Sequence, residues 1–284
     1  MRRLVVVTVL TAFAVAAGSA AFARPPGAEE ILRRAEDVRN PDLDYAVEFT
    51  IHGVSRGESV AVRDASYSMI ASGKDRTVIL MRSPDPFYGG LVLMAEGRNW
   101  MLLPKASTPR ELFSAQMTNG DVATGALARM NLTRGYAVSL AGESTIDGEA
   151  CWRLELVAKS PQTHYARVVY WVTRPRLLPR KLEYYGRSDK LLKTVVYADY
   201  RKGALGLRSM QLTIESFDEW KESSTLSFSK LRKLNGGRET FTPEGMIALR
   251  DAAIATGDAS AAKDVSLERI LRFMEPPRPR APSH

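Results

Sequence analysis

The chain contains one cysteine and three histidines in 284 residues. A single cysteine, Cys151, excludes an intramolecular disulfide, and we expect it to be a small buried apolar residue. His52, His164 and His284 lie far apart, and none has the His-x-x-x-His or Cys-x-x-Cys spacing typical of zinc sites. The sequence therefore predicts no metal site and no cofactor.

Motifs that carry catalysis are also missing. There is no Gly-x-Ser-x-Gly nucleophile elbow. Gly89-Gly90 and Gly236-Gly237 are isolated pairs and do not form a phosphate-binding loop. A Ser-His pair using His52 or His164 would have to be assembled by the fold alone. We therefore expect no catalytic residues and no enzymatic activity.

Basic residues outnumber acidic ones, and the net charge is +8. The densest basic stretches, 174–180 and 230–238, are interrupted by Pro, Leu and Gly and lack the interleaved aromatics of a nucleic-acid site. We expect no nucleic-acid partner. Anionic lipid headgroups and an acidic partner protein remain possible partners for such a surface, beside an ordinary basic surface without a partner.

No hydrophobic run is long enough to cross a bilayer as a helix. The longest, residues 4–17, follows Arg2 and Arg3 and precedes the small-x-small sequence Ala21-Phe22-Ala23. This run falls short of the roughly 20 residues that a spanning helix needs. The pattern is typical of a secretory signal peptide over residues 1–23. We expect cleavage after Ala23 and a periplasmic location, with retention as an anchor as the alternative.

After an amphipathic helix expected at residues 28–38, the apolar period changes from 3.6 to two. Tyr45, Val47, Phe49 and Ile51 alternate with smaller or polar residues, as in a half-buried strand. Similar short strands are expected at 59–62, 66–71, 77–81, 91–95, 100–103, 137–140, 151–157, 166–173, 181–185, 191–197, 209–215 and 224–228. Their near-regular spacing predicts one strongly curled sheet. The strand at 166–173 has bulky residues at both parities and should be covered on both faces.

The last part of the chain leaves the β pattern. Thr242-Pro243-Glu244 is typical of a helix start, and a second helix is expected at 264–274. Residues 276–284 contain four prolines and are expected to be disordered. The expected organisation is therefore a signal peptide (1–23), a curved β domain (24–241), a helical extension (242–275) and a tail (276–284).

Several strand-and-turn segments together resemble a known family. They are Ser83-Pro84-Asp85-Pro86 with Gly90-Leu91-Val92-Leu93, Asn99-Trp100-Met101-Leu102-Leu103-Pro104, the segment from Ile146 to Leu156, and Tyr170-Trp171-Val172 with the segment from Leu178 to Tyr185. Over residues 40–215 the chain resembles the LolA-like, outer-membrane lipoprotein-sorting class of periplasmic proteins. One departure is residues 116–122, Gln-Met-Thr-Asn-Gly-Asp-Val, where many relatives have Phe-x-Gly-Ser-Asp-Phe. This departure leaves the cargo and the partner open.

The resemblance implies a mainly β (α+β) fold: a strongly curved antiparallel sheet that forms an incomplete barrel, with helices across its open side. In the lipoprotein carriers an apolar cavity between sheet and helices holds acyl chains. Strand parity suggests candidates for lining such a cavity: Phe87, Trp100, Leu102, Trp152, Leu154, Tyr170 and Val172.

The resulting hypothesis is a periplasmic carrier or chaperone for lipoprotein acyl chains, lipid or another apolar ligand. One alternative is a regulatory module that senses the state of the envelope through a membrane protein partner. A second alternative is a lipid hydrolase that uses His52 or His164.

Overall fold

The computed structural model describes residues 26–56, 60–83, 88–112, 129–161, 163, 165–217, 221–234 and 241–254. Within them, thirteen strands form one sheet with the order β6-β5-β4-β3-β2-β1-β13-β12-β11-β10-β9-β8-β7. All the pairings between neighbouring strands are antiparallel. The strands are β1 (Tyr45–Arg56), β2 (Val60–Ser72), β3 (Arg76–Ser83), β4 (Leu91–Ala95), β5 (Arg98–Leu102), β6 (Arg110–Leu112), β7 (Tyr136–Ile146), β8 (Glu149–Ala158), β9 (Arg167–Thr173), β10 (Pro179–Tyr185), β11 (Leu191–Gly203), β12 (Gly206–Ser216) and β13 (Glu222–Lys233).

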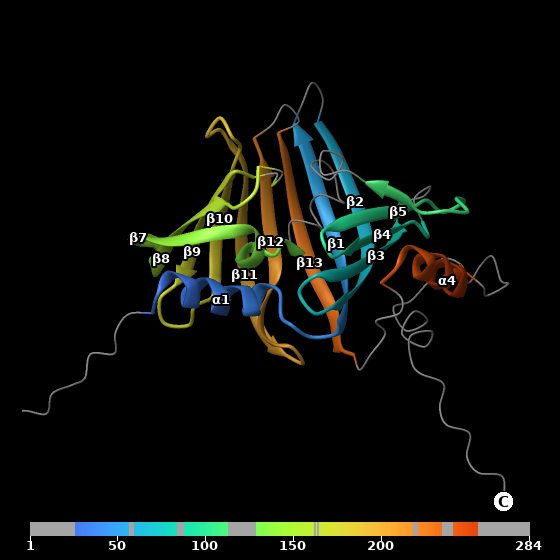
Figure 1. The fold of residues 1–284 in the computed structure, drawn as a ribbon, viewed down its shortest axis with the longest axis horizontal. Helices are drawn as coiled ribbons and strands as arrows, with labels where there is room; N and C mark the ends of the chain where they lie inside the picture. The colour runs from blue at the N-terminus through green and yellow to red at the C-terminus, as the bar shows by residue number, and fades with distance from the viewer. Residues whose placement is uncertain are drawn as a thin grey trace, which may run out of the picture.

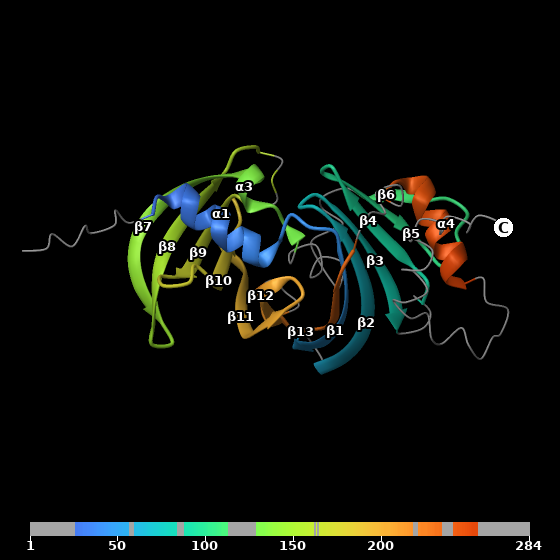
Figure 2. The same ribbon diagram turned by 90° about the horizontal axis from the view of Figure 1, so that it is seen from below.

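The sheet curves strongly but does not close, because the end strands β6 and β7 do not pair with each other. Figure 2 shows β7 to β10 curving around α1 (Ala28–Arg39) at one end, and α4 (Pro243–Ile254) lying beside β4 to β6 at the other. The predicted fold class, a mainly β incomplete barrel with helices, is confirmed.

The two faces of the sheet carry separate apolar clusters. Val47, Phe49 and Ile51 of β1 belong to the larger inner cluster on the concave face. Ala46, with the opposite parity, belongs to a smaller outer cluster under α4. The alternation expected for this strand is therefore observed, and because successive side chains of a strand point to opposite faces, β1 separates the two clusters.

Helix α1 lies across one half of the concave face (Figure 1) and contacts β7, β10 and β12. Its buried apolar side chains are Ile31, Leu32 and Ala35. Glu29 and Glu30 lie in its first turn and Arg39 in its last, as the helix dipole favours. The expected helix at 28–38 is confirmed, one residue longer. Among the described residues no helix is long and apolar enough to cross a membrane.

Helix α4 begins where the sequence predicted a helix start. The Thr242 hydroxyl oxygen accepts a hydrogen bond from the Gly245 amide at 3.0 Å, which satisfies a free amide of the first turn. Met246 and Leu249 are buried in the outer cluster against β4 and β5. Helix α4 therefore covers the outer face of the sheet, opposite the concavity. The expected signal peptide, second C-terminal helix and tail lie outside the described residues.

Two segments differ from the sequence expectation. The strands expected at 59–62 and 66–71 form the single strand β2, because polar residues between them continue the pairing with β1. The part of the chain after residue 103, where no alternation is visible, contains the three-residue strand β6 and the one-turn helix α3 (Leu132–Gly135). A strand of three residues and a single helical turn are too short for an apolar pattern to repeat.

Candidate ligand cavity

An apolar groove lies on the concave face, at the centre of the sheet and beneath the C-terminal end of α1. The space between its lining residues is about 640 Å³, part of which is open solvent. It is lined by Val38, Arg39, Tyr45, Val47, Phe49, Met69, Arg129, Pro179, Tyr197, Tyr200, Arg208, Ser209, Leu212, Leu226, Phe228 and Leu231.

Strand register places the apolar floor of this groove. Phe49 of β1 is paired with Phe228 of β13, and their ring centroids are 5.8 Å apart. Leu226 of β13 is paired with Leu212 of β12. Since paired residues of neighbouring strands point to the same face, the alternation in each strand produces one continuous apolar surface across β1, β13 and β12.

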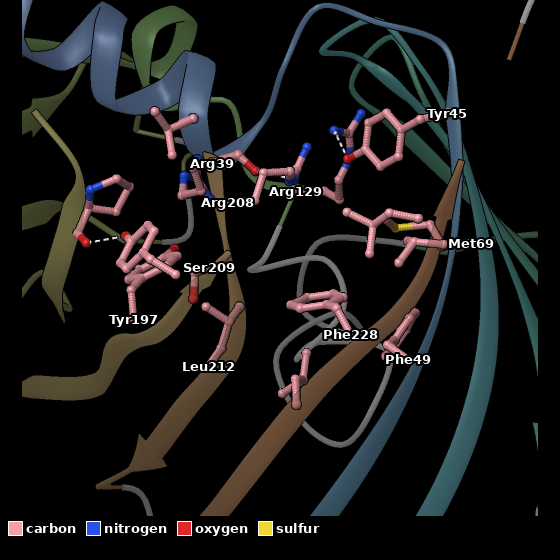
Figure 3. A pocket seen from close by; sticks show the side chains of 16 residues that line it. Arg39, Tyr45, Phe49, Met69, Arg129, Tyr197, Arg208, Ser209, Leu212 and Phe228 are labelled. Carbon is pink, nitrogen blue, oxygen red and sulfur yellow. Dashed lines mark hydrogen bonds between the residues drawn. The ribbon is translucent and has the colours of Figure 1, made fainter. Parts of the chain in front are cut away.

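The opposite end of the groove is polar and contains three arginines. Figure 3 shows Arg39, Arg129 and Arg208 together with Tyr45 at the end under α1, and Phe49, Phe228 and Leu212 at the other end. The groove is therefore amphipathic along its length.

Arg39 is neutralised within the protein. Its guanidinium donates to both carboxylate oxygens of Glu36, at 2.7 and 2.6 Å, and both side chains are almost completely buried. The same guanidinium donates to the Met130 carbonyl, and Glu36 accepts from the Leu132 amide at 3.2 Å. This ion pair ties α1 to the segment that leads into β7.

Arg129 is buried and held by neutral acceptors. It donates to the Thr77 hydroxyl at 2.9 Å, to the Tyr45 hydroxyl at 3.0 Å and to the Gly73 carbonyl at 2.8 Å. These contacts use β1, β3 and the turn between β2 and β3, so the guanidinium is fixed in position.

Arg208 of β12 reaches the same place from the other side. It donates to the Arg39 carbonyl at 3.0 Å, and its guanidinium carbon lies 5.1 Å from the centre of the Tyr45 ring. Burial raises the pKa of Tyr45, but the guanidinium groups of Arg129 and Arg208 outweigh burial, and the pKa is lowered. The polar end of the groove therefore has a positive potential.

Two further tyrosines line the wall formed by β11. Burial raises the pKa of Tyr197 to about 12. Tyr200 donates its hydroxyl to the Pro179 carbonyl, and burial raises its pKa well above the usual range. Both phenols are therefore neutral at physiological pH and present aromatic surface to the groove.

The seven residues suggested by strand parity occupy three places. Trp152, Leu154, Tyr170 and Val172 are buried in the inner cluster on the concave face, though none of them lines the groove. Trp100 and Leu102 belong to the outer cluster with α4, and Phe87 lies outside the described residues. Contact of these residues with a ligand stays a prediction.

Parity alone could not orient β5, because both faces of the β4–β5 hairpin are apolar. Leu91, Leu93 and Leu102 face the outer cluster, whereas Val92 and Met101 face the inner one. The arginines of the groove had no sequence signature either, since residues 39, 129 and 208 come from distant segments. The alternation predicted for β1 does place Tyr45, Val47 and Phe49 on one face, and all three line the groove.

Residues with catalytic potential lie elsewhere. His52 is on the outer face of β1, more than half exposed, with its ring 2.7 Å from Asp64 of β2. Cys151 is buried, and burial raises the pKa of its thiol. In the part of the chain that the structure describes, no three His, Cys, Asp or Glu side chains gather as metal ligands. His164 lies outside that part.

Comparisons with known proteins fit this architecture. A family model with the description "-like: Uncharacterized protein" matches residues 73–246. A LolA superfamily protein from Nitrosomonas europaea superposes with a TM-score of 0.69 at 27% identity, covering 77% of this chain and 99% of that one. No curated protein matches the chain.

Two other solved structures are similar in fold. A DUF1329 family protein from Desulfovibrio piger has a TM-score of 0.66 at 21% identity, covering 77% of this chain and 97% of its own. A putative outer membrane lipoprotein-sorting protein domain from Vibrio parahaemolyticus has a TM-score of 0.65 at 17% identity, covering 78% and 98%. At these identities the likeness concerns the fold alone.

Proposed function

The chain belongs to the LolA-like, outer-membrane lipoprotein-sorting family, and from this premise we propose that it is a non-catalytic periplasmic carrier or chaperone. Its cargo is lipoprotein acyl chains, lipid or another apolar ligand held in the groove between the sheet and α1. The proposal includes export, with cleavage after Ala23.

The observation that carries the proposal is the apolar floor formed by Phe49, Phe228, Leu226 and Leu212 on the concave face. Phe228 and Leu231 are only partly buried. A ligand that covers them removes apolar surface from water, which is worth about 25 cal/mol per Å². A longer acyl chain that displaces α1 would reach four residues of the inner face: Trp152, Leu154, Tyr170 and Val172.

A charge placed in the floor tests this proposal. Phe228→Glu puts a carboxylate among apolar side chains, and we expect it to weaken binding of a fluorescent acyl probe to delipidated protein by about 10-fold or more. The matched control is Ser227→Glu, which adds the same charge to the exposed outer face of the same strand. Ser227→Glu should bind the probe like the wild type.

Three outcomes would contradict parts of this proposal. If the wild-type protein shows no saturable probe binding, the carrier function is wrong. If both variants bind like the wild type, the probe does not occupy this groove. Recovery of one stoichiometric membrane protein without lipid would favour the regulatory module instead.

A further inference from the structure

We propose that the polar end of the groove, formed by Arg129, Arg208 and Tyr45, binds the anionic headgroup of an amphiphile whose acyl chain lies along the apolar floor. The headgroup is a compact oxyanion, a carboxylate or a phosphate. This inference rests on the proposed carrier function and names its ligand class: anionic rather than neutral apolar molecules.

The first observation is the lack of charge compensation. Among the described residues, neither Arg129 nor Arg208 forms an ion pair with a carboxylate. Buried charges in proteins are ordinarily paired, because removing a charge from water without a partner is costly. Arg39 lines the same groove and follows that rule, because it forms an ion pair with Glu36. In the described part of the chain, the buried Arg129 and the partly buried Arg208 therefore both lack a carboxylate partner.

The second observation is an unused donor. One terminal nitrogen of Arg208, Nη1, is buried and has no hydrogen-bond partner, although Nη2 donates to the Arg39 carbonyl. A buried guanidinium nitrogen without an acceptor costs roughly 1–3 kcal/mol, and more when charged. An oxyanion at the end of the groove would accept this donor and remove that penalty.

The third observation is the arrangement of the three groups. The guanidinium carbons of Arg129 and Arg208 lie 5.6 and 5.1 Å from the centre of the same Tyr45 ring. Arg129 is fixed by Thr77, Tyr45 and Gly73, so one of the two cations is already oriented before a ligand arrives. Arginine is also the side chain best suited to carboxylates and phosphates, because its donors form a planar fork.

The fourth observation is continuity with an apolar surface and with a basic surface outside. The polar end and the apolar floor line one groove (Figure 3). A second hollow, at the β11–β12 hairpin, shares Arg208 and Leu231 with the groove and adds Arg201, Lys202 and Lys230. Because Arg201 is paired with Asp199 and Lys230 with Glu48, Lys202 is the added cation that makes this approach positive, and a positive approach raises the local concentration of anionic ligands.

The test compares a fluorescent long-chain fatty acid with its methyl ester, which has the same chain and no charge. We expect the wild-type protein to bind the acid about 10-fold or more tightly than the ester, the size of a charge-assisted hydrogen bond. Arg208→Gln should abolish this preference and leave ester binding unchanged. Arg110→Gln removes an exposed charge from the end strand β6, which lines neither hollow, and should retain the preference.

Inorganic phosphate is added as a competitor at the same pH and ionic strength. If phosphate alone displaces the acid as effectively as an unlabelled fatty acid does, the site recognises a free anion and the amphiphile assignment is overturned. If acid and ester bind equally to the wild type, the headgroup site is wrong while the carrier function stands. If neither probe binds, the carrier function itself fails.

Discussion

At the scale of single residues, the interior of the protein is unusual for its buried phenols. Tyr170, Tyr184 and Tyr197 are all buried near the Glu36–Arg39 ion pair. Burial raises the pKa of each one, because a phenolate would have to lose its hydration. For Tyr197 the pKa is raised to about 12, compared with an ordinary value near 10.

This shift predicts a loss of stability at high pH. A group whose pKa is higher in the folded state stabilises the fold fully below its unfolded pKa and loses that contribution as the pH rises through its folded pKa. We therefore expect the free energy of unfolding in urea to fall between pH 10 and about 12, by on the order of 2 kcal/mol from Tyr197 alone.

The control for this prediction is Tyr197→Phe, which removes the titrating group and keeps the ring. Tyr45, whose pKa is lowered, contributes with the opposite sign, so the difference between wild type and variant is the quantity to measure. Equal slopes of unfolding free energy against pH in the two proteins would contradict the assignment.

At the scale of elements, α1 is attached to the sheet by a charged contact as well as by its apolar face. Because Glu36 and Arg39 are both buried, removing one partner leaves an uncompensated charge. We expect Arg39→Met to lower the free energy of unfolding by about 3–5 kcal/mol. The double variant Glu36→Leu with Arg39→Met should cost less, since no buried charge remains. If the double variant loses as much free energy of unfolding as Arg39→Met and Glu36→Leu lose separately when added together, this account is contradicted.

A substitution in helix α4 should change stability without changing ligand binding. Leu249 is buried in the outer cluster, on the face opposite the groove, so Leu249→Ala should lower the free energy of unfolding by about 2–5 kcal/mol. Under conditions where the variant is folded, its affinity for the acyl probe should equal that of the wild type. A changed dissociation constant would mean that the outer face takes part in binding.

The elements themselves were largely predictable from the sequence. The strand expected at 91–95 coincides with β4, because it is a short continuous apolar run. The helix expected at 28–38 matches α1 to within one residue, because it has one regular apolar face. The face that each strand presents was harder to predict. Trp100 and Leu102 lie under α4. The apolar side of this C-terminal helix packs on the outer face of the sheet, so the strands beneath it carry apolar residues on that face as well.

The groove was not predictable in its details. The sequence does predict a curled sheet with a strand covered on both faces, so that a helix, a plug or a ligand must lie inside the curl. The charged end depends on Arg129, which follows a segment with no regular pattern, and on Arg208, one of many cations in a basic chain. A single sequence does not say which cations lack a partner, because pairing depends on contacts between distant strands.

At the scale of the whole molecule, the strongly curved but unclosed sheet explains how a protein without a catalytic motif can have a specific function. The concave face offers an apolar groove with one positive end, and α1 covers only part of it. The outer face is covered by α4 over β4 and β5. The groove is therefore the place where an elongated amphipathic ligand fits the described part of the chain.

The most direct test of this account is native mass spectrometry of protein recovered from cells without detergent, followed by organic extraction of whatever is bound. The account predicts a discrete added mass that extracts as an anionic lipid or another acyl compound. A clean mass of the ligand-free protein from freshly isolated material, or an added mass that remains with a protein partner after extraction, would contradict it.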